Sequence, residues 1–179
     1  MERKVYRMVA DIDRTLNNAW QRSHDNGVWA REYGGAIVRN IFGSYRVANL
    51  RTDNNPATVD VVPPLFRTTH AEFHTHPDGV PFSIQDVTAM FHHSVRWDVS
   101  IVEAGSKRFA LEITDRGAFE NNLLRNSFRF NRTVDRLERL GHSTIDSHLY
   151  ALREISRDPR SGITVYQSID SNKFRLKEL

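Results

Sequence analysis

The chain has 179 residues, of which 39% are hydrophobic and 26% charged, and this composition predicts one folded domain of ordinary size rather than a disordered chain. It contains no cysteine, which excludes disulfides, thiolate metal ligands and a cysteine nucleophile, and which fits a reducing compartment. The formal net charge of +3 is mild, with a modest arginine surplus over residues 125–160, so we expect a solvated surface and not a nucleic-acid partner.

The first half of the chain alternates helical and strand-like patterns. Residues 10–23 predict a helix, and 36–41 and 44–50 predict two strands joined as a hairpin at Gly43. Further along, 58–64 predicts a short edge strand that ends at its prolines. A strand over 70–77 and a helix over 84–94 follow. One apolar helix face is predicted to consist of Ile12, Leu16, Ala19 and Trp20, and a turn is predicted at Asp25, Asn26 and Gly27.

The second half predicts two strands, two helices and a final hairpin. The strands cover 97–105 and 107–114, and the hairpin covers 163–170 and 173–179. Residues 117–140 predict a helix that stops at Gly141, and Ser143 can cap a second helix that reaches Arg157. The apolar positions of the first of these helices are Phe119, Leu123, Phe128, Val134 and Leu137.

This order of elements predicts a mixed α/β (α+β) fold with a largely antiparallel sheet. We expect a single domain over 1–179, in which 117–160 is a helical insertion or extension before the terminal hairpin. No apolar run approaches membrane-spanning length, and the charged N-terminal stretch MERKVYRMVADIDRT lacks the apolar core of a secretion signal. We therefore expect a cytoplasmic protein without membrane contact.

The stretch HTHPDGVPFSIQD, residues 74–86, is the clearest indication of a functional site. Side chains alternate between the two faces of a strand, so His74 and His76 should point the same way. After the proline and glycine the chain can reverse and bring Asp86 back in the first turn of the next helix. Two imidazoles and a carboxylate are three protein ligands, the number typical of a catalytic zinc site. We predict a zinc site on these three residues, although manganese or iron accepts the same donors.

A hydrolytic site of this kind also needs a carboxylate close enough to take a proton from water. Glu72 lies two residues before His74 and should face the same side of the strand. Glu32 lies just before Gly34 and Gly35, at the start of another predicted strand. Spacing alone does not choose between these two glutamates.

Each part of the pattern also has a purely structural interpretation. Ser83 and Asp86 have the spacing of a capping box, in which a serine and an acid close the start of a helix. Gly34 and Gly35 lack the lysine and spacing of a phosphate loop, so they indicate close backbone packing. We expect Trp20, Trp29 and Trp97 in the core. His92 and His93 are interpreted as surface or core residues, and His24, His142 and His148 as surface or helix-end residues. His70 could face the same side as His74 but lies too far along the strand to bind the same ion easily.

Taken in order, EYGGAIV, HTHP and SIQD resemble the JAMM (JAB or MPN+) zinc metalloproteases, whose pattern is a glutamate and a glycine-bearing strand, then His-x-His-Pro, then Ser-x-x-Asp. The resemblance covers about residues 32–86 and is closest to a bacterial JAB-like branch of unknown function attached to polymorphic toxins. The loop between HTHP and SIQD is one residue shorter than in the best-known members, which affects the loop's shape more than the supply of ligands. Residues 116–179 match no pattern of the family.

The resemblance implies a cytidine-deaminase-like, MPN-type fold and a role for each matching residue. His74, His76 and Asp86 would bind Zn²⁺, and Ser83 would help to stabilise the oxyanion. Glu32 would activate the water and protonate the leaving amine, and the resemblance favours it over Glu72 because the family's glutamate also lies shortly before a glycine.

The expected function is a zinc-dependent hydrolase that cleaves a peptide or isopeptide bond, a JAMM-type metallopeptidase. Its partner would be a protein or peptide substrate, for which the resemblance suggests a ubiquitin-like tail, a pro-segment or a toxin's own linker. Two alternatives come from other classes of protein. One is a non-catalytic MPN-like scaffold that binds a partner protein, and the other is a basic accessory protein whose nucleic-acid binding would depend on salt and not on metal.

Overall fold

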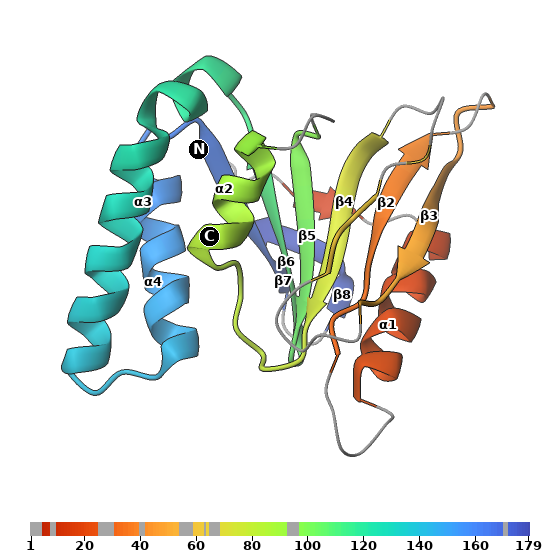
Figure 1. Ribbon diagram of the computed structural model, residues 1–179, viewed down its shortest axis with the longest axis horizontal. Coiled ribbons are helices and arrows are strands. Elements are labelled where there is room, and N and C mark those ends of the chain that lie inside the picture. Colours follow the sequence, from red (N-terminus) through yellow and green to blue (C-terminus); the bar gives the residue numbers. More distant parts are fainter. Residues whose placement is uncertain are drawn as a thin grey trace.

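The computed structural model describes residues 5–7, 10–24, 31–39, 42–53, 59–62, 64, 69–92, 97–169 and 172–179. These residues form one mixed sheet with helices on both faces (Figure 1). The helices are α1 (Ala10–His24), α2 (Ile84–His92), α3 (Arg116–Arg139) and α4 (Thr144–Ser156). The strands are β1 (Val5–Arg7), β2 (Gly34–Arg39), β3 (Tyr45–Arg51), β4 (Thr69–His76), β5 (Val99–Ala104), β6 (Lys107–Ile113), β7 (Ile163–Ile169) and β8 (Asn172–Glu178).

The strands lie in the order β1-β8-β7-β6-β5-β4-β2-β3. All neighbouring pairs are antiparallel except β4 and β5, which are parallel and joined through α2. The predicted mixed α/β fold with a largely antiparallel sheet is therefore confirmed. The helices α3 and α4 form the helical segment expected over 117–160. In the chain they follow β6 and precede β7, which are neighbours in the sheet.

The sequence patterns placed most of these elements within one to three residues, but two differ. No pattern predicted β1, which pairs with β8. The edge strand predicted over 58–64 is wrong, because its described residues, 59–62 and 64, form no strand. Instead Val61 is buried in the core, and the carbonyl of Val62 accepts a hydrogen bond from the Asn49 side chain. The turn predicted at 25–27, Trp29 and His93 lie outside the described residues.

The paired glycines at the start of β2 allow neighbouring segments to approach closely. A Cβ on Gly34 would lie 2.8 Å from Val59 Cγ1, and one on Gly35 would lie 2.9 Å from the Phe73 ring. Both distances are shorter than ordinary van der Waals contact. The expectation of close backbone packing is confirmed. These glycines also lie in the strand beside β4, which carries His74 and His76.

One face of the sheet is covered by α1. Its apolar face packs on Phe73, Ile101 and Tyr166. The same helix is also held by charge, since Arg108 of β6 is fully buried and donates to Glu103 at 2.7 Å and to Asp13 of α1 at 2.6 Å. The predicted apolar face of α1 is confirmed for Ile12, Leu16 and Ala19, which are buried, whereas Trp20 is half-buried.

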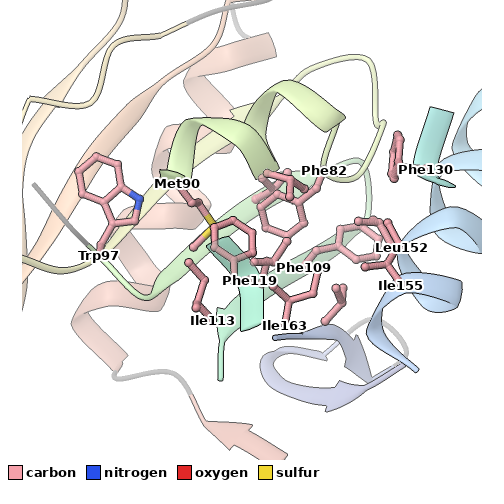
Figure 2. Packing of buried hydrophobic residues seen from close by; sticks show 14 of the residues in the cluster. Phe82, Met90, Trp97, Phe109, Ile113, Phe119, Phe130, Leu152, Ile155 and Ile163 are labelled. Carbon is pink, nitrogen blue, oxygen red and sulfur yellow. The ribbon is translucent and has the colours of Figure 1, made fainter. Parts of the chain in front are cut away.

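The opposite face is covered by α2, α3 and α4. Phe82, Met90 and Trp97 pack there with Phe109 and Phe119 beneath α2 (Figure 2). Trp97 is buried, as predicted. The apolar face of α3 runs through Phe119, Leu123, Asn126, Phe130, Thr133 and Val134.

The helix register of α3 differs at one predicted apolar position. Phe128 is 69% exposed, and Phe130 is buried in its place. Phe130 lies seven residues after Leu123, which is two helical turns, so it shares the buried face, whereas Phe128 is turned away from it.

Within the part of the chain that the structure describes, no helix is long and apolar enough to cross a membrane.

Candidate metal centre

The pairing of β2 with β4 brings the predicted site residues together. In this antiparallel pair Gly34 lies opposite His74, and the amide of Thr75 donates to the carbonyl of Tyr33 at 2.9 Å. Continuing the register places Glu32 opposite His76. Because alternate residues share a face, Glu32 and both histidines point toward the face that α2 covers.

His74, His76 and Asp86 form a compact group of donor atoms. One ligand atom from each residue lies within 4.8 Å of the other two. Oδ1 of Asp86 is 3.2 Å from Nε2 of His74, and Oδ2 is 3.6 Å from Nε2 of His76. Both histidines are buried, and their ring centroids are 4.7 Å apart. The ligand set predicted from the sequence is thus assembled at the end of β4 and the start of α2.

Hydrogen bonds fix both imidazoles so that Nε2 faces the group. Nδ1 of His76 lies 2.8 Å from the carbonyl of Val80 and 3.2 Å from that of Pro81. A carbonyl can only accept, so this Nδ1 carries the proton and the Nε2 of the neutral ring keeps its lone pair. Nε2 of His74 is buried and makes no hydrogen bond of good geometry among the described residues. A buried nitrogen of this kind, aimed at a carboxylate, fits a metal ligand.

Glu72 contacts the ring nitrogen of His74 that is not next to Asp86. Its Oε2 lies 3.2 Å from Nδ1 of His74, and its Oε1 accepts a hydrogen bond from Ser100 of β5. The parallel register explains the second contact, because Glu72 is paired with Ser100. A carboxylate that accepts from the far nitrogen of a ligating histidine orients the ring and raises its basicity. The structure therefore gives Glu72, one of the two candidate bases, a positioning role.

Glu32 lies next to the group, beside His76. Its Oε1 is 3.9 Å from Nε2 of His76, and its side chain is buried. Burial raises the pKa of Glu32 from its ordinary 4.5 to about 7; His74 opposes this shift and the carboxylate of Asp86 adds to it. A carboxylate with a pKa near neutral is well matched to accept a proton from water and return it.

The charges of the three ligand residues are strongly coupled. Burial alone would lower the pKa of His74, but the carboxylates of Glu72 and Asp86 outweigh it and hold that pKa well above the usual range. Burial and the nearby His74 lower the pKa of His76. His74 opposes the effect of burial on Asp86 and keeps the pKa of that carboxyl well below its usual range. The raised pKa of His74 favours the protonated ring between the carboxylates of Glu72 and Asp86.

The structural interpretation of Ser83 and Asp86 is also correct. Oδ2 of Asp86 accepts from the amide and the hydroxyl of Ser83, at 2.6 and 2.7 Å, and the Asp86 amide donates to Ser83 Oγ at 3.2 Å. This is a capping box, and it uses Oδ2 while Oδ1 faces His74. The box and the metal site are therefore compatible. The Ser83 hydroxyl proton points at Asp86, so to donate to an oxyanion it must leave that carboxylate.

A cavity of about 640 Å³ opens onto the group. Besides the site residues its lining includes Val61, Met90, Trp97, Thr144 and His148. The last two belong to α4, so the helical segment after residue 116 forms one wall of the site.

His148 is the residue that sequence reasoning missed. We expected a surface or helix-end histidine, but it lies in the middle of α4 and its side chain is partly buried. Its Nδ1 is 3.3 Å from the carbonyl of Phe82, and its ring packs edge-on against Phe130. No local signal marks it, because only the packing of α4 brings it to the cavity.

The other described histidines behave as expected. His24 and His142 are exposed at or beyond helix ends, and His70 packs edge-on against Tyr45 of β3. The side chain of His92 lies outside the described part.

No protein-family model, curated protein or solved structure matches this chain. The function proposed below therefore depends on the chain's own residues and their geometry.

Proposed function

We propose that this chain is a zinc-dependent hydrolase of peptide or isopeptide bonds, similar to the JAMM metalloproteases. The observation that carries the proposal is the meeting of His74, His76 and Asp86 with the buried carboxylate of Glu32 at one end of a cavity. Two neutral nitrogens and one carboxylate are the donor set of a catalytic zinc site. We also propose that the fold is of the MPN type. The mixed sheet with helices on both faces is compatible with that fold.

When bound, a zinc ion would supply Lewis-acid polarisation of the scissile carbonyl and a water of lowered pKa. Glu32 takes the proton of the attacking water and returns it to the departing amine, and its pKa near 7 suits both directions. Glu72 holds Nδ1 of His74, so that Nε2 would be available to the ion. Ser83 positions Asp86 and, once its hydroxyl is released, can donate to the oxyanion.

The substrate under this proposal is a protein or peptide that enters the cavity as an extended segment. The cavity of about 640 Å³ has the volume of an ordinary ligand-binding pocket, so it can hold part of such a segment. A ubiquitin-like tail is one substrate of this shape. Because α4 contributes Thr144 and His148 to the lining, we expect the segment after residue 116 to influence which sequences are accepted.

Elemental analysis and a cleavage assay together test the proposal. We expect about one zinc per purified chain, lost in His74→Ala and kept in Glu32→Gln. Zinc-loaded protein is then incubated with a diverse peptide mixture, and new termini are identified by mass spectrometry. Cleavage should occur with the unmodified chain and disappear with Glu32→Gln.

Two results would contradict the proposal in different ways. Cleavage by Glu32→Gln at the full rate would remove Glu32 from its role as base. Zinc bound in the expected ratio, without cleavage of any peptide or ubiquitin-like conjugate, would favour the non-catalytic scaffold instead.

A further inference from the structure

A second hollow lies along the α3–α4 hairpin and has no lining residue in common with the metal centre. Its volume is about 780 Å³. Tyr150, Glu154, Asp158 and Pro159 contribute to its wall, and the rest is guanidinium groups. The arginines that line it are Arg125, Arg129, Arg136, Arg153, Arg157 and Arg160.

Half of these arginines already hold one carboxylate. Oδ2 of Asp158 lies 2.6 Å from Arg125 and 2.9 Å from Arg129, and Oδ1 lies 3.2 Å from Arg160. The backbone amide of Arg160, which donates to Oδ1 at 3.0 Å, and the side chains of Arg160 and Arg125 hold the pKa of Asp158 well below its usual range. The contacts of Asp158 show that this part of the hollow holds a carboxylate among guanidinium donors.

The other half have no acidic partner. Among the described residues, no carboxylate oxygen lies within 4.0 Å of Arg136, Arg153 or Arg157, and Nε of Arg153 is buried without a hydrogen-bond acceptor. The six arginines face only Asp158 and Glu154, so four positive charges remain in excess. Such a concentration of like charge raises the local concentration of anions.

The spacing of the arginines favours an extended ligand. Arg125, Arg129 and Arg136 lie on one face of α3, and over these eleven residues the helix rises about 16 Å. Arg153 lies in the last turn of α4, which lies beside α3, and Arg157 is the C-cap residue four positions later. The donors thus form two rows rather than a single point, and an arginine fork binds a carboxylate through two parallel hydrogen bonds.

The lining favours an acidic polypeptide over a nucleic acid. Grooves that bind single-stranded nucleic acid combine positive charge with several aromatic side chains on which bases stack. Tyr150 is the only aromatic residue among those that line the hollow. Carboxylate side chains need no stacking surface, and Asp158 already shows the mode of binding.

We propose that the hollow on the α3–α4 hairpin binds an acidic segment of a partner protein, rich in aspartate and glutamate. Binding is independent of the metal centre, so it can succeed or fail separately from the hydrolase activity. The site also gives a role to the arginine surplus over residues 125–160.

The test uses fluorescence anisotropy with a labelled octaglutamate peptide and, in a second arm, a labelled oligothymidylate of equal length. Arg136→Glu/Arg157→Glu reverses two exposed arginines of the hollow. Arg22→Glu/Arg46→Glu makes the same change in net charge at exposed positions elsewhere. We expect octaglutamate to bind the unmodified chain and the control equally, and the hollow variant about tenfold or more weakly. Binding should weaken with added salt and persist in His74→Ala.

Three results would overturn the proposal: no binding of octaglutamate at low salt, equal weakening by both charge variants, or tighter binding of oligothymidylate that the hollow variant abolishes. The last would identify a nucleic-acid groove. Circular dichroism melts check that the variants fold, and Arg136→Gln/Arg157→Gln, which introduces no like-charge contact, replaces the hollow variant if it melts early.

Discussion

Glu72 supports the proposed metal centre through its contact with His74 and is not itself one of the ligand residues. It joins Ser100 of β5 to Nδ1 of His74, so the strand pairing itself fixes the direction of the imidazole. We predict that Glu72→Ala lowers zinc affinity about 10- to 100-fold, as loss of such outer contacts does elsewhere. Competition with a fluorescent zinc chelator measures the change. Glu138→Ala, at an exposed position of α3, is the control, and equal affinity in both variants would leave Glu72 without this role.

Glu32 makes a separate prediction about pH in the metal-free protein. Its pKa rises from 4.5 to about 7 on folding, so the folded chain holds this proton more tightly than the unfolded chain does. The resulting stability is fully present below about pH 4.5 and is lost as the pH rises through about 7. Glutamine cannot ionise. With a chelator present, Glu32→Gln should therefore be more stable than the unmodified chain above about pH 7, and the difference should vanish at acid pH.

Denaturant titrations of the two proteins over this pH range measure the difference in free energy of unfolding. Glu138→Gln supplies the matched control, because its side chain is exposed and should give no pH-dependent difference. A constant offset between Glu32→Gln and the unmodified chain across the whole range would mean that the carboxyl of Glu32 titrates normally in the fold.

At the scale of elements, α2 and α4 offer a comparison built into the chain. Both begin with Ser-x-x-Asp, and in both the serine hydroxyl donates to the aspartate at 2.7 Å. Only the aspartate of α2 also faces His74. We predict that Ser83→Ala and Ser143→Ala each cost about 1 kcal/mol of stability, the usual cost of losing a cap.

Zinc binding should distinguish the two caps. Ser83→Ala removes the hydroxyl bond to Oδ2 of Asp86 and keeps the one from the backbone amide, so Asp86 is held less firmly and zinc affinity should weaken. Ser143→Ala should leave zinc affinity unchanged. Thermal melts give the stabilities and a chelator competition gives the affinities. If both variants bound zinc like the unmodified chain, the capping box would have no part in holding Asp86 for the ion.

The elements also show which features could be predicted from the sequence. Alternation along a strand was enough to place His74 and His76 on one face, and a helix start was enough to bring Asp86 back to them. The role of Glu72 was beyond these local rules, because it depends on the parallel pairing of β4 with β5. The position of His148 was equally hidden, since it follows from how the α3–α4 pair packs on the sheet.

Two predictions from the sequence failed, the strand over 58–64 and the buried position of Phe128. Residues 59–62 have the β-branched, alternating pattern of a strand, but the packing of Val61 in the core and the capture of the Val62 carbonyl by Asn49 keep them out of the sheet. The spacing of apolar residues over 117–140 predicts Phe128 on the apolar face of α3, but the register of Leu123 and Phe130 excludes it. Non-local packing decided the first case, whereas helical periodicity decided the second.

For the whole molecule, the ligand residues of the metal centre come from β4 and α2, so a bound ion would join these two elements. Zinc at about 100 times its dissociation constant should stabilise the fold by about 2.7 kcal/mol. The effect should depend on pH because of His74. Its raised pKa adds stability to the metal-free fold that is fully present below about pH 6.5 and is lost as the pH rises through the folded value.

Zinc must displace that proton, so the increase in melting temperature on adding zinc should be larger at about pH 8 than at about pH 6. Differential scanning calorimetry with and without zinc at each pH measures it, and His74→Ala should abolish the increase at both. An increase of the same size at the two pH values would show that His74 is already neutral in the metal-free fold. The ion and the proton would then not compete for the place between Glu72 and Asp86.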